Sequence, residues 1–279
     1  STGILVALLL AMTTGNRAGW TSPPIIAAFS GTVVMLVSFI WWELHTDAPM
    51  LDLRLFKGRT FTFGVTAAFL TFLGSSAVLF MMPFYLQNVL GYSAKTAGFV
   101  VVPGALCMAV LGTVSGVLSD RFGRRPFTVG GLASSAVGLF ILSRVTEDSS
   151  LFMVVPALML MNAGMGIFYS PNSSSVMSTV GQIKYGVVSG FLNLVRNAAN
   201  VSSIAVATII VTTTMASQGF EPSLQAVRDE VPGVASAFTL GLRYAFLTMM
   251  GIVLASMTLS ALQPNHVEEP ELLESPTKV

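Results

Sequence analysis

Polar side chains inside otherwise apolar stretches are the residues of this sequence best suited to chemistry. Arg196 lies about nine residues into an apolar run at 187–213, which is about 14 Å along a helix axis. The spacing of Asn193, Arg196 (or Asn197) and Asn200 places them on one helix face. A charge at such depth in a membrane faces protein or water. The stripe therefore predicts either a cavity wall that contacts a ligand or hydrogen bonds between helices, and the sequence leaves both open.

A second polar zone lies within the apolar run at 151–177. It combines amide, phenol and hydroxyl groups with glycines and a proline: Asn162, Gly164, Gly166, Tyr169, Ser170, Pro171 and Asn172. The proline and glycines predict a kink or break, which membrane proteins use at binding sites. Asn162, Tyr169 and Asn172 are therefore further candidate cavity residues. Close helix packing around a proline bend is the alternative.

Metal binding and acid–base catalysis lack suitable residues inside the apolar runs. His45 and His266 lie outside these runs, so no metal site is predicted. None of the 13 acidic residues falls deep in a run, and a proton relay in a membrane usually needs a carboxylate or histidine there. An intramembrane enzyme would need a nucleophile with a base, paired acids or a metal cluster. We therefore expect neither enzymatic activity nor a cofactor.

The composition defines the setting in which these polar residues act. Of 279 residues, 10% are charged and 53% are hydrophobic, and the mean hydropathy is +0.76. Soluble domains carry about 25% charged residues, so an ordinary soluble enzyme and a disordered chain are both excluded. The net charge of +1 excludes a nucleic-acid-binding protein. The chain is predicted to be an all-α membrane protein.

Apolar runs of membrane length account for most of the chain. A broken run at 3–13 is too short to span a bilayer, which takes about 20 residues, so we expect the chain to begin inside a truncated helix. None of the runs shows the alternation of a membrane β-barrel. Seven full runs follow, at 25–44, 61–86, 96–118, 127–143, 151–177, 187–213 and 238–262.

The distribution of lysine and arginine predicts the orientation of these helices. When the loop at 119–126 is placed in the cytoplasm, cytoplasmic segments hold eight Lys and Arg residues and external segments hold four. Short cytoplasmic loops are enriched in these residues. The bias therefore predicts a cytoplasmic C-terminus.

The loop around Gly116 has the most specific motif, GVLSDRFGRRP at 116–126. Gly116 allows close approach of another helix, and Gly123 can adopt a positive φ in the turn. Asp120 is unfavourable near a helix C-terminus unless it is paired. The basic residues suit the cytoplasmic end of a helix: Arg121, Arg124 and Arg125. A basic loop that serves only topology is the alternative to a specific interaction.

This loop resembles the signature of the major facilitator superfamily, glycine-x-leucine-x-aspartate-arginine-x-glycine-arginine-basic. The strings YLQNVLGYS at 85–93 and GFLNLVRN at 190–197 are similar to the fourteen-helix drug:proton antiporters of that superfamily. The resemblance covers nearly the whole chain, as helices seven to fourteen. It implies a truncated helix, a second inserted helix and a cytoplasmic linker at 1–60, and a C-terminal six-helix bundle at 61–262. The acidic residues and prolines from Gln263 onward predict a disordered cytoplasmic tail at 263–279.

The resemblance also implies a function. The chain would be part of a proton-coupled exporter of amphipathic or cationic small molecules in a bacterial cytoplasmic membrane. Its partner would be an N-terminal six-helix bundle, on which we expect the proton-binding group. Asp120, Arg121 and Arg124 would latch helices across the bundle interface, with Gly116 at the contact. The alternatives are a transporter of a specific polar metabolite and a seven-helix receptor, and the receptor would need a complete first helix.

Overall fold

The computed structural model describes residues 53–224, 227 and 232–263. The helices expected at 3–13 and 25–44, and the acidic tail beyond Gln263, lie outside the described residues. The chain divides into two units, Ser1–Leu55 and Phe56–Val279. All the membrane-length helices of the described part belong to the second unit.

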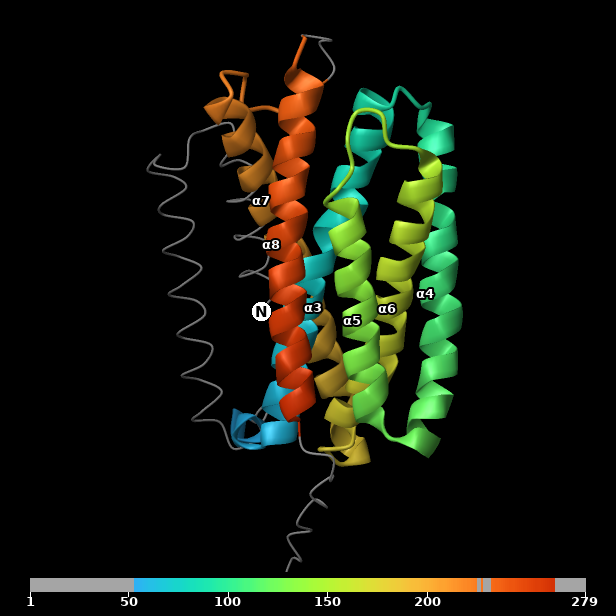
Figure 1. Cartoon of the computed structure of the whole chain (residues 1–279). Coiled ribbons are helices and arrows are strands. Elements are labelled where there is room, and N and C mark those ends of the chain that lie inside the picture. Colours follow the sequence, from blue (N-terminus) through green and yellow to red (C-terminus); the bar gives the residue numbers. More distant parts are fainter. Residues whose placement is uncertain (1–52, 225–226, 228–231, 264–279) are drawn as a thin grey trace, which may run out of the picture. The chain divides into compact units, whose positions relative to one another are not determined.

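Six helices in the described part are long and apolar enough to cross a membrane (Figure 1). They match the six runs expected between 61 and 262, and no end differs by more than four residues. The connector expected at 215–237 is shorter than predicted, because helices extend into it from both sides. The six are α3 (Arg59–Phe84), α4 (Ala94–Phe122), α5 (Arg124–Leu142), α6 (Leu151–Met177), α7 (Tyr185–Ser217) and α8 (Val234–Leu262).

The helix ends follow from local sequence. The Ser93 hydroxyl accepts the Thr96 backbone N–H at 3.2 Å at the start of α4, as expected of an N-cap serine. Beyond Pro83, α3 widens into one π-helical turn, η2 (Tyr85–Val89), before the chain turns. Between α4 and α5, Gly123 has a φ of 86°, which confirms the expected positive φ in this tight loop.

Two helices of the bundle, α6 and α8, each pack against several of the others. α6 packs against both α4 and α5, while α8 packs against α5, α3 and α7 (Figure 1). Glycines lie where α4 and α5 come closest to α6: Gly112 of α4 lies against Gly166, and Gly131 of α5 lies against Gly164. Large buried side chains such as Phe168, Phe238 and Phe246 fill the interior. Small residues thus set the distances between helices, as expected in a membrane.

Hydroxyl groups join neighbouring helices within this apolar interior. Ser256 on α8 donates to the Ala67 carbonyl of α3 at 2.8 Å, and its oxygen lies 2.8 Å from the Thr71 hydroxyl. The Ser135 hydroxyl of α5 donates to the Met161 carbonyl of α6 at 2.9 Å. These bonds satisfy buried polar groups where lipid could not.

Candidate functional site

A cavity of about 490 Å³ lies among α3, α4, α6 and α7. Four of the seven candidate cavity residues line it: Asn162 on α6, and Arg196, Asn197 and Asn200 on α7. The rest of the lining is mostly aromatic, aliphatic and thioether, with two hydroxyls: Phe72, Ser75, Ser76, Leu79, Phe80, Met108, Met161, Met165 and Ile204. The cavity therefore combines a soft apolar wall with one cationic and amide-bearing wall.

Arg196 is the charged group of the cavity. Its guanidinium carbon lies 5.9 Å from the centroid of the Phe72 ring, within range of a cation–π contact. Phe72 in turn packs edge-to-face on Tyr169, with ring centroids 5.6 Å apart. Among the described residues, no carboxylate pairs with Arg196. Its N–H donors are therefore available to a molecule in the cavity, and Tyr169 supports Phe72 from outside the lining.

Hydrogen bonds hold two of the amide side chains in the cavity wall. Ser76 on α3 donates to the Asn200 Oδ1 atom on α7 at 2.5 Å, which joins the two helices. Asn162 donates through Nδ2 to the Leu158 carbonyl of its own helix at 2.9 Å. The buried Ser75 hydroxyl has no hydrogen-bond partner among the described residues. The Ser75 hydroxyl can therefore form a hydrogen bond with a molecule in the cavity after a small shift of its side chain.

Sequence reasoning did not select the α3 side of this cavity. Ser75 and Ser76 interrupt the apolar run at 61–86, and adjacent hydroxyls in such a run were the signal available. Phe72, Met108 and Met165 gave no comparable signal, because phenylalanine and methionine occur throughout the helices.

Besides Tyr169, two further candidate residues, Asn172 and Asn193, lie outside the cavity lining. Asn172 is 1% exposed and donates through Nδ2 to the Gly64 carbonyl at 3.0 Å, so it joins α6 to α3. Asn193 is exposed and donates to the Ser189 carbonyl of its own helix at 3.1 Å. The structure therefore gives Asn172 a role in helix packing and leaves Asn193 at the surface of this bundle.

We expect Asn172→Ala to destabilise the protein without weakening substrate binding. The change removes the bond to Gly64, and interhelical bonds of this kind contribute about 1 kcal/mol in membranes. Unfolding of the full-length protein in dodecyl sulfate would measure the loss, with Asn193→Ala as the matched control. Weaker substrate binding by a stably folded Asn172→Ala protein would contradict this assignment.

The loop motif lies at the end of α4 and contacts α6. Arg124 donates through Nη1 to the Ser178 hydroxyl at the C-terminus of α6, at 3.0 Å. A Cβ at Gly116 would lie 2.6 Å from the Ser170 hydroxyl, so this glycine packs against α6 of the same bundle. Asp120, Arg121 and Arg125 are exposed, and Asp120 has no ion pair with a described residue. The Asp120 carboxylate is therefore available to a partner outside the described residues.

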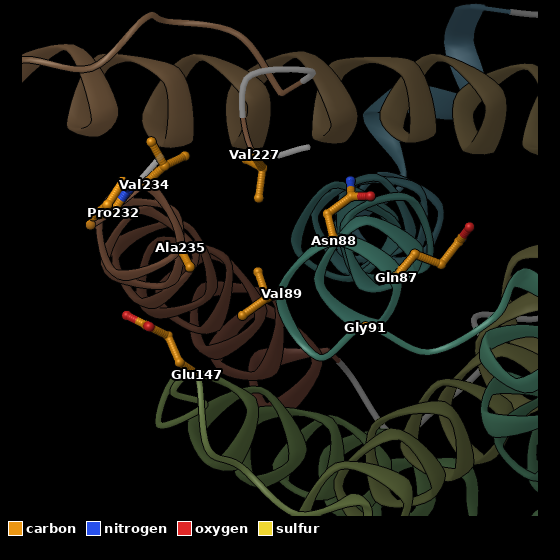
Figure 2. Close-up of a pocket in the computed structure, with 10 residues that line it drawn as sticks. Gln87, Asn88, Val89, Gly91, Glu147, Val227, Pro232, Val234 and Ala235 are labelled. Atoms are coloured by element: carbon orange, nitrogen blue, oxygen red, sulfur yellow. The ribbon is translucent and has the colours of Figure 1, made fainter. Parts of the chain in front are cut away.

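A second hollow, of about 620 Å³, lies where α3 ends and α8 begins. Figure 2 shows Gln87 and Asn88 on one side of it and Glu147 on the other, with Val89 between. No candidate cavity residue lines this hollow. The described residues hold no group of three or more His, Cys, Asp or Glu side chains that could bind a metal ion. The cavity at Arg196 is therefore the site best supported by the sequence and the geometry together.

Comparison with known proteins identifies the class to which this fold and cavity belong. The family model described as Major Facilitator Superfamily matches residues 1–204. The chain belongs to that superfamily, which confirms the resemblance of the α4–α5 loop. The six helices of membrane length in its described part show that it is part of an integral membrane protein.

Several named relatives are resistance or transport proteins. The lincomycin resistance protein LmrB of Listeria monocytogenes is 25% identical over 248 residues, which is 87% of this chain and 52% of that protein. The multidrug resistance protein Stp of Mycobacterium tuberculosis is 28% identical over 226 residues, covering 81% and 42%. The riboflavin transporter RibZ of Clostridioides difficile is 31% identical over 155 residues, covering 56% and 34%. The chain thus spans about half the length, or less, of these relatives.

The solved structures support the same fold. A bacterial homologue of the human lysosomal transporter Spinster, in an inward-facing and unoccupied conformation, matches with a TM-score of 0.58 at 17% identity. The match covers 92% of this chain and 64% of that one. At this identity the likeness concerns the helical architecture.

Proposed function

We propose that the protein containing this chain exports small amphipathic organic molecules by alternating access, with this chain supplying one of two bundles. The observation that supports this most directly is the cavity at Arg196. Its phenylalanine and methionine side chains can repack around ligands of different shape, while Arg196 and the amides orient a hydrogen-bond acceptor. The resistance proteins LmrB and Stp among the relatives agree with export of such molecules.

We place the energy coupling on the other bundle. Of the acidic residues in the described ranges, Asp120 alone lies within a membrane-length helix, at its last turn. Movement of protons through a membrane needs a titratable group within it. A proton-coupled mechanism, in a bacterial cytoplasmic membrane with the C-terminus in the cytoplasm, would therefore use a carboxylate or histidine of the N-terminal half.

Transport of one specific polar metabolite is the second candidate function. RibZ, a relative named as a riboflavin transporter, favours it, as do the three amide side chains in the cavity. A specific transporter would satisfy its ligand with many fixed hydrogen bonds, and a multidrug exporter would rely on the apolar wall.

Transport by the full-length protein in proteoliposomes distinguishes these candidates. We expect a pH gradient to drive uptake of several chemically unrelated amphipathic compounds, each competing with the others. Transport of one compound with no competition by the rest would favour the specific transporter. No transport of any compound under a pH or ion gradient would overturn the proposed function.

We expect Asp120→Asn to change the balance between inward-facing and outward-facing states. The exposed carboxylate at the end of α4 is free to pair across the bundle interface, and the amide cannot form that ion pair. Accessibility of single cysteines at the two membrane faces would measure a shift of roughly tenfold, as expected for loss of one well-formed ion pair. Arg125→Gln, which also removes one charge from this loop, is the control. Unchanged transport and accessibility in Asp120→Asn would contradict the latch.

A further inference from the structure

A groove of about 670 Å³ runs between the end of α5 and the first half of α8. It shares no lining residue with the cavity at Arg196. The α8 residues in its wall recur at helical spacing: Ser236, Thr239, Leu240 and Arg243. The α5 wall and the turn after it contribute Phe140, Ser143, Arg144, Val145 and Thr146. The groove therefore holds two arginines, one from each side.

Neither arginine is neutralised by the described part of the chain. Both are exposed, and neither forms an ion pair with a described residue, although Glu147 and Asp148 follow Arg144 closely. The guanidinium carbon of Arg144 lies 4.8 Å from the centroid of the Phe140 ring, which positions it over the groove wall. Two guanidinium groups in one groove attract an anion.

The position of the groove along α8 indicates what kind of anion is available. α8 has 29 residues, so it is about 43 Å long, which matches a bilayer including its headgroups. Arg243 lies nine residues after Val234, about 14 Å from that end. Side chains on a helix tilt toward its N-terminus, and arginine extends toward the interface. Arg243 can therefore reach the layer of lipid headgroups.

The surface beside the groove suits acyl chains. Val137 is 50% exposed and Phe140 is 42% exposed on α5, and Tyr244 is 50% exposed on α8. Exposed apolar side chains on membrane helices are compatible with lipid acyl chains, which are about as apolar as leucine. An anion held by the two arginines would thus have a hydrocarbon-compatible surface next to it.

We propose that this groove binds an anionic phospholipid, with its phosphate on Arg144 and Arg243 and an acyl chain along Val137 and Phe140. Arginine forms paired hydrogen bonds with phosphate oxygens, which phospholipid headgroups supply. The lipid site in the α5–α8 groove is separate from the cavity, and lipid binding there does not depend on what the protein transports.

Native mass spectrometry of the full-length protein in detergent tests the site. Phosphatidylglycerol is titrated against the wild-type protein, Arg144→Gln, Arg243→Gln and the double variant. We expect roughly tenfold weaker retention by the double variant, with intermediate losses for the single changes. Lys95→Gln removes an exposed charge near the start of α4, at the same end of the bundle, and should retain the lipid as the wild type does.

Two ligand controls identify the source of the phosphate. Diacylglycerol with the same acyl chains lacks the phosphate and should neither be retained nor raise the unfolding temperature of the wild-type protein. Glycerol 3-phosphate carries the phosphate without acyl chains and should not compete. Equal retention by the double variant, equal binding of diacylglycerol, or full competition by glycerol 3-phosphate would each overturn the proposal. If the double variant does not fold, comparing phosphatidylglycerol, diacylglycerol and glycerol 3-phosphate on the wild-type protein still tests the proposal.

Discussion

Gly131→Ala is expected to lower the free energy of unfolding by about 2 kcal/mol, a typical cost of forcing an extra methyl group into a filled core. A Cβ at Gly131 would lie 2.7 Å from the Gly164 carbonyl oxygen and 2.8 Å from the Phe168 backbone nitrogen. Both neighbours are backbone atoms of α6, so no side chain can rotate away to relieve the clash. α5 would have to move away from α6, which also breaks the bond from Ser135 to the Met161 carbonyl.

Gly130→Ala is the matched control for this prediction. Gly130 is the preceding residue of the same helix, and a Cβ there would meet no atom within 4 Å. Replacing glycine by alanine in a helix stabilises it by up to about 1 kcal/mol where there is room. Dodecyl sulfate unfolding of both variants in the full-length protein should therefore show changes of opposite sign. Equal stability of the two variants would contradict the close approach of α5 and α6.

Arg196→Gln is expected to weaken substrate binding by roughly tenfold to a hundredfold, the range for loss of a hydrogen bond to a charged group in a desolvated site. Arg196 has no carboxylate partner among the described residues, so its donors are free for substrate. Arg196→Lys keeps the charge but loses the planar set of donors, and we expect an intermediate loss. Binding of the transported compounds to the purified full-length protein measures both.

The control for Arg196→Gln comes from the same helix. Asn193 lies about one turn before Arg196, is exposed and does not line the cavity. Asn193→Ala should leave binding unchanged within twofold. Unchanged affinity in Arg196→Gln for every transported compound would remove this cavity from the proposed function.

The six described membrane spans could be predicted from the sequence because a bilayer imposes a length and an apolar composition on each of them. α6 and the C-terminal end of α8 occur at the predicted residues, and the other ends differ by four residues or fewer. The positive φ at Gly123 and the close approach at Gly116 also followed from local chemistry, since glycine alone lacks a Cβ. The resemblance implied that Gly116 lies at a contact across the bundle interface, whereas the described residues place it against Ser170 of α6 in the same bundle.

The set of residues that line the cavity depended on how the helices pack. Asn162 and Asn172 lie ten residues apart, which rotates them about 80° around the axis of α6. One side chain consequently lines the cavity, while the other bonds to the Gly64 carbonyl of α3. Phe72 and Ser76 join the site because α3 lies beside α7, a contact between segments more than 100 residues apart.

The amino-acid sequence by itself therefore determined the class of protein, the positions of its described spans and the polar residues available to a site. These depend on composition and on local helical geometry, which each segment has independently. Only the tertiary structure decided that Asn162, Arg196, Asn197 and Asn200 line one cavity and that Arg144 and Arg243 line one groove. Such groupings depend on how each helix is rotated about its axis, and contacts with the neighbouring helices set that rotation.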